Sequence, residues 1–317
     1  MNDARAETHD SPLQLTVVTP VKNAVEHIAA CIESVAAQDL TGVEHLVLDG
    51  GSTDGTLDVA RELAARYPHV RLVEGHDEGQ SEAMNKGVGL AMAPILGFLN
   101  ADDVYLPGAI ASAVAALRTA TEPSFFWGAL LIRYPNRVKV WRPGRFEPRK
   151  LLVGPAAHPY PINPAAYFYH RSLHDVAGTF DEQDHYAMDA DFLIRASFHV
   201  STVIRTHEVL GEYRLVPGSK TFDDEANGTG SSRITPILER YLADLPPRQR
   251  LQVRVERVVS APYLFVRRVM EYVGVRIRRP RPSSNNYPPG VNPEGTHEPA
   301  RQPSAAHRGP EVPHRRW

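Results

Sequence analysis

The stretch Ile95-Leu-Gly-Phe-Leu-Asn-Ala-Asp-Asp103 joins a short apolar run to a polar, acidic end. An apolar run of this length, closed by polar residues, is typical of a strand buried on both faces of a parallel sheet. Earlier runs of the same character lie at Leu15–Thr19, Val43–Leu48 and Val70–Val73. Together the runs predict a set of parallel strands that is complete by residue 99.

The segments between these runs have the spacing of amphipathic helices. One apolar face is formed by Ile28, Cys31, Ile32 and Val35, and another by Leu57, Ala60, Leu63 and Ala64. Strands that alternate with helices predict an α/β fold with a Rossmann-like, mostly parallel, doubly wound sheet. Ligands bind such sheets at the carboxyl ends of the strands, so the loops after the runs are where a site is expected.

The second part of the chain has a different pattern. Residues 124–145 resemble two antiparallel strands around the turn Tyr134–Arg137. From about 150 to 220 the sequence is rich in Pro, His and Tyr, with one helix-like piece at Met188–Phe198. This region has no clear apolar period of its own, so we expect it to build on the first sheet and face the same cleft.

These patterns predict the following organisation. Residues 13–220 form one unit, whose halves are 13–120 and 121–220. Residues 221–279 form a C-terminal helical extension. We expect the polar residues 1–12 to be flexible, and residues 280–317, which hold 9 prolines, to be disordered.

Charge is distributed unevenly along the chain. The net charge is −2, but from Arg248 onward 14 basic residues face 5 acidic ones, giving +9, whereas the preceding residues carry 21 against 32, giving −11. An acidic body argues against nucleic acid as a partner. The single cysteine, Cys31, forbids an intramolecular disulfide and suits a reducing compartment. The polar N-terminus and the lack of a long apolar run disfavour secretion and membrane insertion, so a cytoplasmic protein is expected.

Several common active sites are absent from the sequence. Residues 20–27 (PVKNAVEH) provide no Gly-x-Gly-x-x-Gly turn after the first run, and no P-loop, Gly-x-Ser-x-Gly or His-Glu-x-x-His motif occurs. Dinucleotide oxidoreductase, P-loop and serine-hydrolase functions therefore lose their main support.

Carboxylates at the ends of two runs can support metal and ligand binding. Asp102 or Asp103 offers hard oxygen ligands that suit Mg²⁺ or Mn²⁺, the alternative being a cap on a helix that begins near Pro107. Asp49 precedes Gly50-Gly-Ser-Thr-Asp-Gly-Thr56 and can accept hydrogen bonds from a base or a ribose. The turn itself has a structural alternative, in which Ser52, Thr53 or Asp54 caps the next helix.

In their order and spacing these loops resemble the GT-A glycosyltransferases of family 2, inverting enzymes that use nucleotide-sugars. The residues that carry the resemblance are Val18-Thr-Pro20 with Asn23, Leu48–Thr56, Gly79–Gly87, Phe98–Asp103, Leu106-Pro107, Gly178–Glu182, Ala187–Arg195, Tyr213-Arg214 and Pro217–Ser219. The similarity spans about residues 13–220, and implies that 13–120 is the nucleotide-sugar half and 121–220 the acceptor half.

The resemblance implies roles for residues of the nucleotide-sugar half. Thr19, Pro20 and Asp49 would line the base and ribose pocket, and Asp102 would bind the metal that holds the diphosphate. Asn100 stands where the family more often has the first aspartate of Asp-x-Asp, so it is assigned to the nucleotide and not to the metal. Met84 stands where many relatives have arginine, and Asp77, Asn85 and Lys86 are the substitutes in that loop. For Lys86 a solvated helix position is the alternative.

The acceptor half would supply the base. Inversion requires one carboxylate to take the proton of the incoming hydroxyl, and the family uses the second acid of a Glu-Asp pair. Met188-Asp189 matches that pair, which makes Asp189 the candidate and Asp191 the second choice. The structural alternative for Asp189 is a carboxylate favoured by the helix N-terminus. His158 is a weaker candidate for contact with the acceptor.

Arginines interleave with apolar residues in 248–279, for example Val253, Val255, Val258 and Val259. A basic amphipathic helix can lie on an anionic bilayer, which would make the protein peripheral at the inner face of the membrane. The alternative is a helix packed on the body with solvated arginines, because Pro262 interrupts the period.

The sequence thus predicts an inverting, Mn²⁺- or Mg²⁺-dependent glycosyltransferase. Its donor would be a UDP-, GDP- or dTDP-sugar, and its acceptor a glycan or a lipid-linked hydroxyl in polysaccharide or glycolipid biosynthesis. Two alternatives remain, a nucleotidyltransferase and a non-catalytic nucleotide- or carbohydrate-binding module on the same fold.

Overall fold

The computed structural model describes residues 12–39, 41–154, 157–184, 187–215 and 230–272, with the backbone alone for 230–232 and 261–272. In the first half the elements are β1 (Leu15–Val21), α1 (Ile28–Ala36), β2 (Val43–Asp49), α2 (Thr56–Arg66), β3 (Val70–Glu74), α3 (Gln80–Leu90), β4 (Ile95–Phe98), β5 (Val104–Tyr105) and α4 (Ala109–Leu117). The rest of the chain adds β6 (Ser124–Tyr134), β7 (Arg137–Trp141), α5 (Pro148–Val153), the 3₁₀ turn η1 (Pro164–Ala166), β8 (Tyr167–His170), α6 (Leu173–Ala177), α7 (Met188–Ser197), β9 (Thr202–Arg214), α9 (Gly230–Asp244) and α10 (Pro247–Tyr272).

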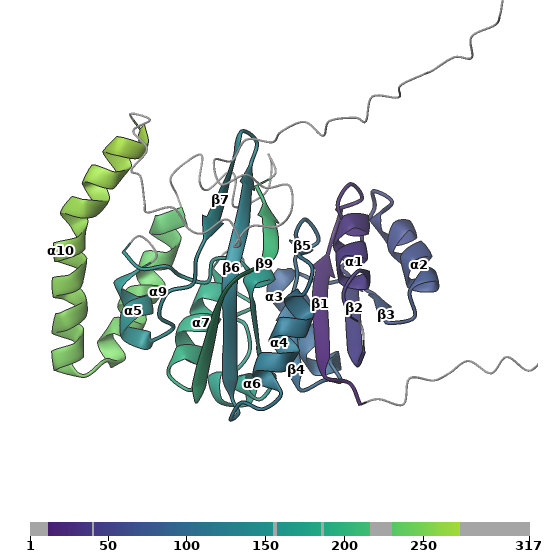
Figure 1. Cartoon of the computed structure of the whole chain (residues 1–317), viewed down its shortest axis with the longest axis horizontal. Helices are drawn as coiled ribbons and strands as arrows, with labels where there is room; N and C mark the ends of the chain where they lie inside the picture. The colour runs from purple at the N-terminus through teal and green to yellow at the C-terminus, as the bar shows by residue number, and fades with distance from the viewer. Residues whose placement is uncertain (1–11, 40, 155–156, 185–186, 216–229, 273–317) are drawn as a thin grey trace, which may run out of the picture.

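The strands form one continuous sheet in the order β3-β2-β1-β4-β8-β6-β9-β5, with β7 paired to β6 (Figure 1). The pairings β3-β2-β1-β4 are parallel, β8 is antiparallel to both β4 and β6, and β9 is parallel to β6. Six strands, β1 to β4 with β6 and β9, therefore point the same way. The predicted mostly parallel α/β sheet is confirmed, and both halves of the predicted unit contribute strands to it.

The four predicted strands are β1 to β4, and each agrees with its apolar run to within two residues at either end. Burial follows the sequence pattern, since every residue of β2 and β4 is buried. Helix α1 buries Ile28, Cys31, Ile32 and Val35, which are the residues of its predicted face. A Cβ on Gly87 would lie 2.4 Å from Val18 Cγ1, so glycine there lets α3 lie directly against β1.

Two capping alternatives are decided by the structure. The N-cap of α4 is Gly108, which makes no side-chain cap, so Asp102 and Asp103 do not cap that helix. The N-cap of α2 is Gly55, but Asp54 Oδ1 accepts a hydrogen bond from Thr56 N at 3.0 Å. Asp54 thus supports the start of α2 from one residue before the N-cap.

The second half has the predicted hairpin and additional elements that the sequence pattern did not indicate. Tyr134 pairs with Arg137 at the turn between β6 and β7, as expected, and α7 matches the predicted helix-like piece. Strands β8 and β9 and the short helices α5 and α6 were not predicted. The aromatic rings of Phe125, Phe146 and Tyr169 stack in the core beneath them.

Helices α9 and α10 form most of the predicted helical extension, and α10 is continuous across position 262. Figure 1 places α10 at the opposite end of the molecule from α2. The predictions for 1–11 and 280–317 lie outside the described residues. Of the helices within the described residues, none combines the length and the apolar character needed to span a bilayer.

Candidate active site

The loops that follow β1 and β2 are tied into one rim at the carboxyl edge of the sheet. Asn23 has a left-handed backbone (φ 54°), and its Oδ1 accepts a hydrogen bond from Thr53 N at 2.8 Å. Asn23 N donates to Ser52 Oγ at 3.0 Å, and Val25 N donates to Asp54 Oδ2 at 3.1 Å. Because hydrogen bonds run in both directions between the loops, the rim is a fixed framework.

Two buried carboxylates behind this rim lack hydrogen-bond partners for most of their oxygens. Asp49 Oδ1 accepts from Gly51 N and Ser52 N, each at 3.0 Å, whereas its Oδ2 has no donor among the described residues. Neither oxygen of Asp77 has one either, and Asp77 Oδ2 lies 3.4 Å from the Cβ that Gly50 would carry. Buried polar oxygens are costly without donors, so this pair fits a ligand that brings N–H or O–H groups.

Lys86 is the cation that forms an ion pair with Asp77. It projects from α3, which Gly87 lets pack on β1, and its Nζ lies 3.5 Å from Asp77 Oδ1. A Cβ on Gly75 would come within 2.9 Å of Lys86 Nζ, so glycine leaves room for the ammonium group. The predicted residues Asp49, Asp77 and Lys86 are thus brought together at the ends of β2 and β3.

Thr19 and Pro20 are at the end of β1, but they differ in exposure. The Thr19 hydroxyl is fully buried and lies 2.9 Å from His45 Nε2, inside the domain. Burial lowers the pKa of His45 to about 3, so its ring is neutral. Pro20 is half-buried and pairs with Leu48. The Thr19 side chain therefore supports the strand from within, and Pro20 is the one nearer to the surface.

Asn100 uses both ends of its side-chain amide within the protein. Its Oδ1 accepts a hydrogen bond from Gln80 Nε2 at 3.1 Å, and its Nδ2 donates to Asp103 Oδ2 at 3.1 Å. These contacts link the end of β4 to the first residue of α3. The amide that replaces the more frequent aspartate thus orients its neighbours.

Asp103 is the buried centre of this loop, whereas the sequence pattern offered it only as an alternative to Asp102 as metal ligand or helix cap. In addition to Asn100, Asn163 Nδ2 donates to its Oδ2 at 2.8 Å, and Arg214 N donates to its Oδ1 at 3.2 Å. Burial raises the pKa of Asp103 well above its ordinary value, and the adjacent Asp102 raises it further. The only sequence signal was the position of Asp103 beside Asp102, and nothing pointed to Asn163.

Asp102 is the acid of this loop whose carboxylate remains available to bind a ligand or a metal ion. It is half-buried, and no side chain of another described residue hydrogen-bonds to it. Burial raises the pKa of Asp102, and the positive charges of His27 and Arg214 lower it. Arg214 is held by Glu212, with Nε 3.0 Å from Oε1.

The residues of this loop fit a minimal divalent metal site. Within the described residues, no cluster of three or more His, Cys, Asp and Glu side chains is arranged to hold a metal ion. Mg²⁺ commonly takes only one or two protein carboxylates and completes its shell with water and substrate phosphate. The free carboxylate of Asp102 meets that requirement, and Asp103 is already committed to three donors.

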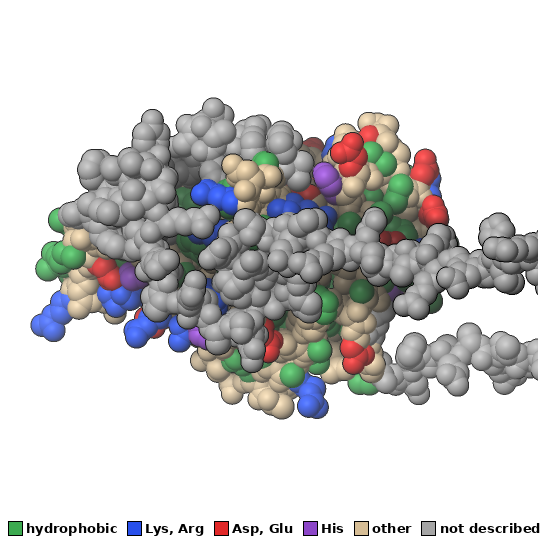
Figure 2. Space-filling view, turned by 45° about the horizontal axis from the view of Figure 1, so that its top comes forward, with side chains coloured by type: hydrophobic (Ala, Val, Ile, Leu, Met, Phe, Trp, Pro, Cys, Tyr) green, Lys and Arg blue, Asp and Glu red, His purple; other side chains and the backbone are tan. Residues whose placement is uncertain are grey.

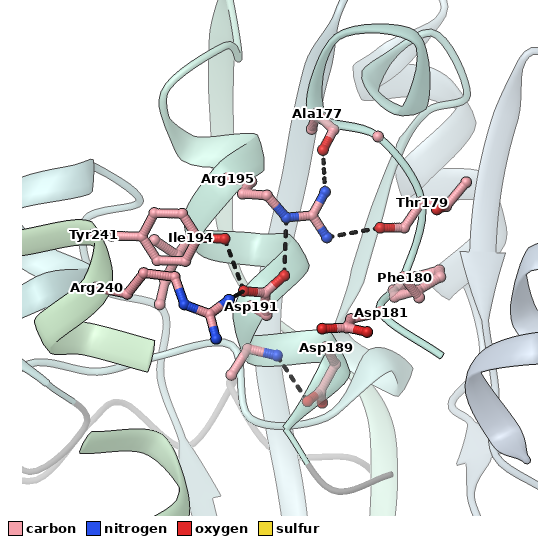
Figure 3. A network of polar contacts seen from close by, with 12 residues as sticks. Ala177, Thr179, Phe180, Asp181, Asp189, Asp191, Ile194, Arg195, Arg240 and Tyr241 are labelled. Atoms are coloured by element: carbon pink, nitrogen blue, oxygen red, sulfur yellow. Dashed lines mark hydrogen bonds and ion pairs between the residues drawn. The ribbon is translucent and has the colours of Figure 1, made fainter. Parts of the chain in front are cut away.

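The acids of α7 point in different directions (Figure 3). Asp189 is half-buried, and its Oδ1 accepts a hydrogen bond from Ala190 N at 2.8 Å. Burial raises the pKa of Asp189 to about 6, and Asp184 adds to the shift. No cation among the described residues forms an ion pair with it. This is a carboxylate that can exchange a proton near neutral pH.

Asp191 is engaged on both oxygens. Its Oδ2 accepts from Arg195 Nε at 2.9 Å, and its Oδ1 accepts from the Tyr241 hydroxyl at 2.8 Å, with Arg240 Nη1 3.7 Å away. Figure 3 shows these groups converging on Asp191 from α7 and α9. The geometry therefore favours Asp189 over Asp191 as a base, and makes Asp191 the joint between the acceptor half and the C-terminal extension.

The segment 177–184 is held from two sides. Arg195 donates to the carbonyl oxygens of Ala177 and of Thr179, the latter at 2.7 Å. Asn85 of α3 accepts from Phe180 N at 2.9 Å and donates to Phe180 O at 3.0 Å. Asn85, predicted to contact the donor, thus fastens the segment 177–184 to α3.

His158 lies where α5 meets α10. Its Nε2 is 2.7 Å from Glu256 Oε1, and the same carboxylate receives Lys150 Nζ and Arg149 Nη1, the latter at 2.7 Å. Its predicted role toward the acceptor has no support from these contacts. The bonds of Glu256 instead fix α10 to the body.

The arrangement of the sheet and the site defines a class of protein. The continuous, mostly parallel sheet with helices on it has the GT-A glycosyltransferase fold. The sequence profile of "Glycosyl transferase family 2" matches residues 16–188, and the chain belongs to that family. It is a glycosyltransferase, which sets aside the nucleotidyltransferase and the non-catalytic module.

Two proteins of known sequence illustrate the relationship. A "PGL/p-HBAD biosynthesis glycosyltransferase" of Mycobacterium tuberculosis (strain ATCC 25177 / H37Ra) is 30% identical over 243 residues, covering 76% of this chain and 87% of that protein. An uncharacterized glycosyltransferase of Escherichia coli K12, YibD, is 36% identical over 98 residues, covering 31% of this chain and 28% of that protein.

Solved structures share the fold. Staphylococcus aureus TarS in complex with UDP-GlcNAc superposes with a TM-score of 0.61 at 17% identity, covering 78% of this chain and 72% of that chain. The mannosyltransferase PcManGT of Pyrobaculum calidifontis, in complex with GDP-Man and Mn²⁺, gives a TM-score of 0.51 at 20% identity, covering 86% and 83%.

Proposed function

We propose that the protein transfers a sugar, with inversion, from a nucleoside-diphosphate donor to a hydroxyl of a glycan or lipid-linked acceptor. The observation that carries this proposal is the contrast on α7. Asp189 has a pKa raised to about 6 and no ion-pair partner among the described residues, whereas Asp191 is fully engaged. An inverting transfer needs one such base on the acceptor side.

Asp189 would take the proton of the acceptor hydroxyl as its oxygen bonds to the anomeric carbon. The bond between that carbon and the diphosphate oxygen breaks, and the diphosphate leaves from the opposite face of the sugar. A base with a pKa near 6 is ionised at neutral pH and is stronger than an ordinary carboxylate, which suits this task.

The nucleotide-sugar half would bind the donor. The unpaired oxygens of Asp49 and Asp77 would accept hydrogen bonds from the base or ribose, next to Lys86 and Pro20. Thr19 and Asn100 would act through the strand and the loop that they support. Asp102 would hold Mn²⁺ or Mg²⁺, which when bound neutralises the charge of the departing diphosphate.

The acceptor class is supported by a relative and by charge. The mycobacterial relative is named for PGL/p-HBAD biosynthesis, and the basic C-terminal part of this chain suits work near an anionic surface. A cytoplasmic location fits the buried, unpaired thiol of Cys31. Polysaccharide or glycolipid biosynthesis is the corresponding process.

A donor panel tests the proposal directly. UDP-, GDP- and dTDP-sugars are added with Mn²⁺, and the shift of the unfolding midpoint reports binding, since stabilisation grows with the logarithm of ligand concentration over Kd. The donor that binds is then incubated with lipid-linked and soluble acceptors, and NMR of the product gives the anomeric configuration. A product with retained configuration would overturn the assignment of Asp189 as a single base.

A further inference from the structure

Helix α10 carries two unlike faces, and the contacts of the described residues fix which of them is turned inward. Val253 is completely buried. Glu256 binds Arg149 and Lys150 of α5, and Arg257 Nη2 donates to Leu152 O at 2.7 Å. These contacts point the side of α10 that holds residues 253, 256 and 257 toward α5, so the helix cannot turn about its axis without breaking them.

The opposite face is apolar and uncovered by the described residues. We call Leu251, Val255, Val258 and Val259 the α10 stripe. They recur at i, i+4, i+7 and i+8, which places them on one side of a helix with 3.6 residues per turn. Their exposed fractions lie between 52 and 72%. The apolar residues of this segment thus divide, with Val253 packed on the body and the stripe turned outward.

Exposed cations accompany the stripe. Arg254 is exposed and its helical position lies beside the stripe, and Arg248 is exposed on the same face as the stripe, about one turn before Leu251. Between residues 247 and 260 the only acid is Glu256, which is bound on the docked side. Figure 2 shows hydrophobic and basic side chains together at the end of the molecule where α10 lies. The result is an apolar band with one exposed arginine beside it and another at its N-terminal end.

We propose that the α10 stripe is a membrane-docking surface that inserts shallowly into an anionic phospholipid bilayer, with Arg248 and Arg254 facing the headgroups. An apolar face accompanied by exposed basic residues is the pattern of helices that lie in the bilayer interface. The docked side faces α5, which belongs to the predicted acceptor half, so that half would be held nearest to the membrane.

Charge argues against the other occupants of the stripe. A second copy would set Arg248 and Arg254 against the same arginines. Residues 273–317 of this chain carry 8 arginines against 3 glutamates, so that segment would also bring cations to cations. An anionic bilayer supplies the complementary charge and the apolar phase together.

Vesicle flotation with the full chain, without donor or acceptor, tests this proposal. The lipids are phosphatidylcholine alone and phosphatidylcholine mixed with phosphatidylglycerol. The stripe variant combines Leu251→Gln, Val255→Gln, Val258→Gln and Val259→Gln. The charge variant combines Arg248→Gln and Arg254→Gln, and the matched control combines Met92→Gln and Val176→Gln, two exposed apolar residues elsewhere that are 58% and 49% exposed.

We expect the wild type and the control to float with the anionic vesicles. The affinity of the stripe variant for these vesicles should fall by about tenfold or more. The charge variant should lose most of its preference for anionic lipid, as should the wild type at high salt. Circular dichroism and the donor-induced shift of the unfolding midpoint should be unchanged in each variant, which separates lipid binding from folding and from the proposed transfer activity.

Equal flotation of the stripe variant and the wild type would overturn the proposal, and so would a wild type that floats with neither lipid. Sedimentation velocity covers the remaining outcome. A dimer that the stripe variant loses, in a protein that does not float, would assign the stripe to a second copy instead of a membrane.

Discussion

The Tyr241 hydroxyl donates a hydrogen bond of 2.8 Å to Asp191 and so joins α9 to the first turn of α7. Asp189 lies two residues before Asp191 in the same turn of α7, but its carboxylate points in a different direction (Figure 3). The C-terminal extension is therefore attached to the helix that presents the proposed base. Removal of that attachment is a way to separate positioning from chemistry.

The hydrogen bond between Tyr241 and Asp191 should be measurable in a double-mutant cycle. Tyr241→Phe should lower the free energy of unfolding by about 1–2 kcal/mol, because the acceptor is charged. Asp191→Asn should cost more, since Arg195 also loses its partner. Chemical denaturation of both single variants and the double variant should give a coupling of about 1 kcal/mol. Strict additivity would show that the bond contributes nothing in solution.

Asp189→Asn should abolish transfer but spare donor binding. Loss of a general base lowers the rate by about 10²–10⁴-fold. We expect kcat to fall within this range, while calorimetry gives the wild-type Kd for the donor. Asp181→Asn, a neighbouring partly exposed acid, is the matched control and should keep nearly full activity. If the donor Kd rises as much as kcat falls, Asp189 belongs to the donor site.

The pKa of Asp189 also predicts pH dependence. Because the folded-state pKa is about 6, above the ordinary value of 3.8, kcat should fall about tenfold per pH unit below 6. The same shift means that the ionised form destabilises the fold. Asp189→Asn should therefore raise the free energy of unfolding by about 1–3 kcal/mol above pH 6, and the gain should vanish as the pH falls toward 4.

Denaturation of the wild type and Asp189→Asn across this pH range checks the second effect. The difference in unfolding free energy between the two proteins should grow between pH 4 and 6 and then level off. A difference that is constant with pH would mean that Asp189 is solvated and not shifted.

Asp102→Asn should remove the metal dependence of donor binding. Its carboxylate is the available acid in the loop after β4, so the Mn²⁺-dependent part of the donor affinity should fall about tenfold or more. Titration of the donor by calorimetry, with Mn²⁺ and with EDTA, measures that part. Asp58→Asn is the control, because the Asp58 side chain is 83% exposed on α2. Equal effects of EDTA on Asp102→Asn and the wild type would contradict the assignment.

Asp77→Asn should weaken donor binding without loss of stability. The buried carboxylate has no hydrogen-bond donor among the described residues, and its ion pair with Lys86 Nζ is long at 3.5 Å, so its burial costs about 1–3 kcal/mol in the free enzyme. An amide costs less to bury than a carboxylate. It also removes one of the oxygen acceptors to which the nucleotide-sugar would hydrogen-bond. We expect the donor Kd to rise about tenfold and the unfolding midpoint to stay equal or increase. Glu62→Gln, exposed on α2, should change neither quantity.

Most of the fold prediction rested on the apolar runs of the strands and the helical spacing between them. The buried runs of β1, β2 and β4 are unmistakable because both faces of those strands are covered, and the edge strand β3 is marked by its short apolar run. Strand β9 was missed since it is half-exposed, and its sequence, TVIRTHEVLGEYR, alternates irregularly between polar and apolar residues. The first part of β9 is partly exposed, residues 210–213 are buried, and the pairing with β6 is irregular around Gly128, so no simple period results.

Within the site, the sequence located acids but not their partners. Asp49, Asp102 and Asp189 stand at strand and helix ends, where local pattern suffices. The engagement of Asn85 with Phe180 depends on packing between the two halves, so spacing along the chain cannot indicate it. The same holds for Asp191, whose partner Tyr241 lies on a different helix.

The position of β9 has a consequence for synthesis of the chain. β9 is the last strand to be synthesised, yet it lies between β6 and β5 in the sheet. The N–H of its final residue, Arg214, donates to Asp103, which lies 111 residues earlier in the chain. Such distant contacts form late and slowly. On the ribosome the loop that carries Asp102 therefore acquires its final shape only after residue 214 has emerged, and a shorter nascent chain holds two unpaired strand edges.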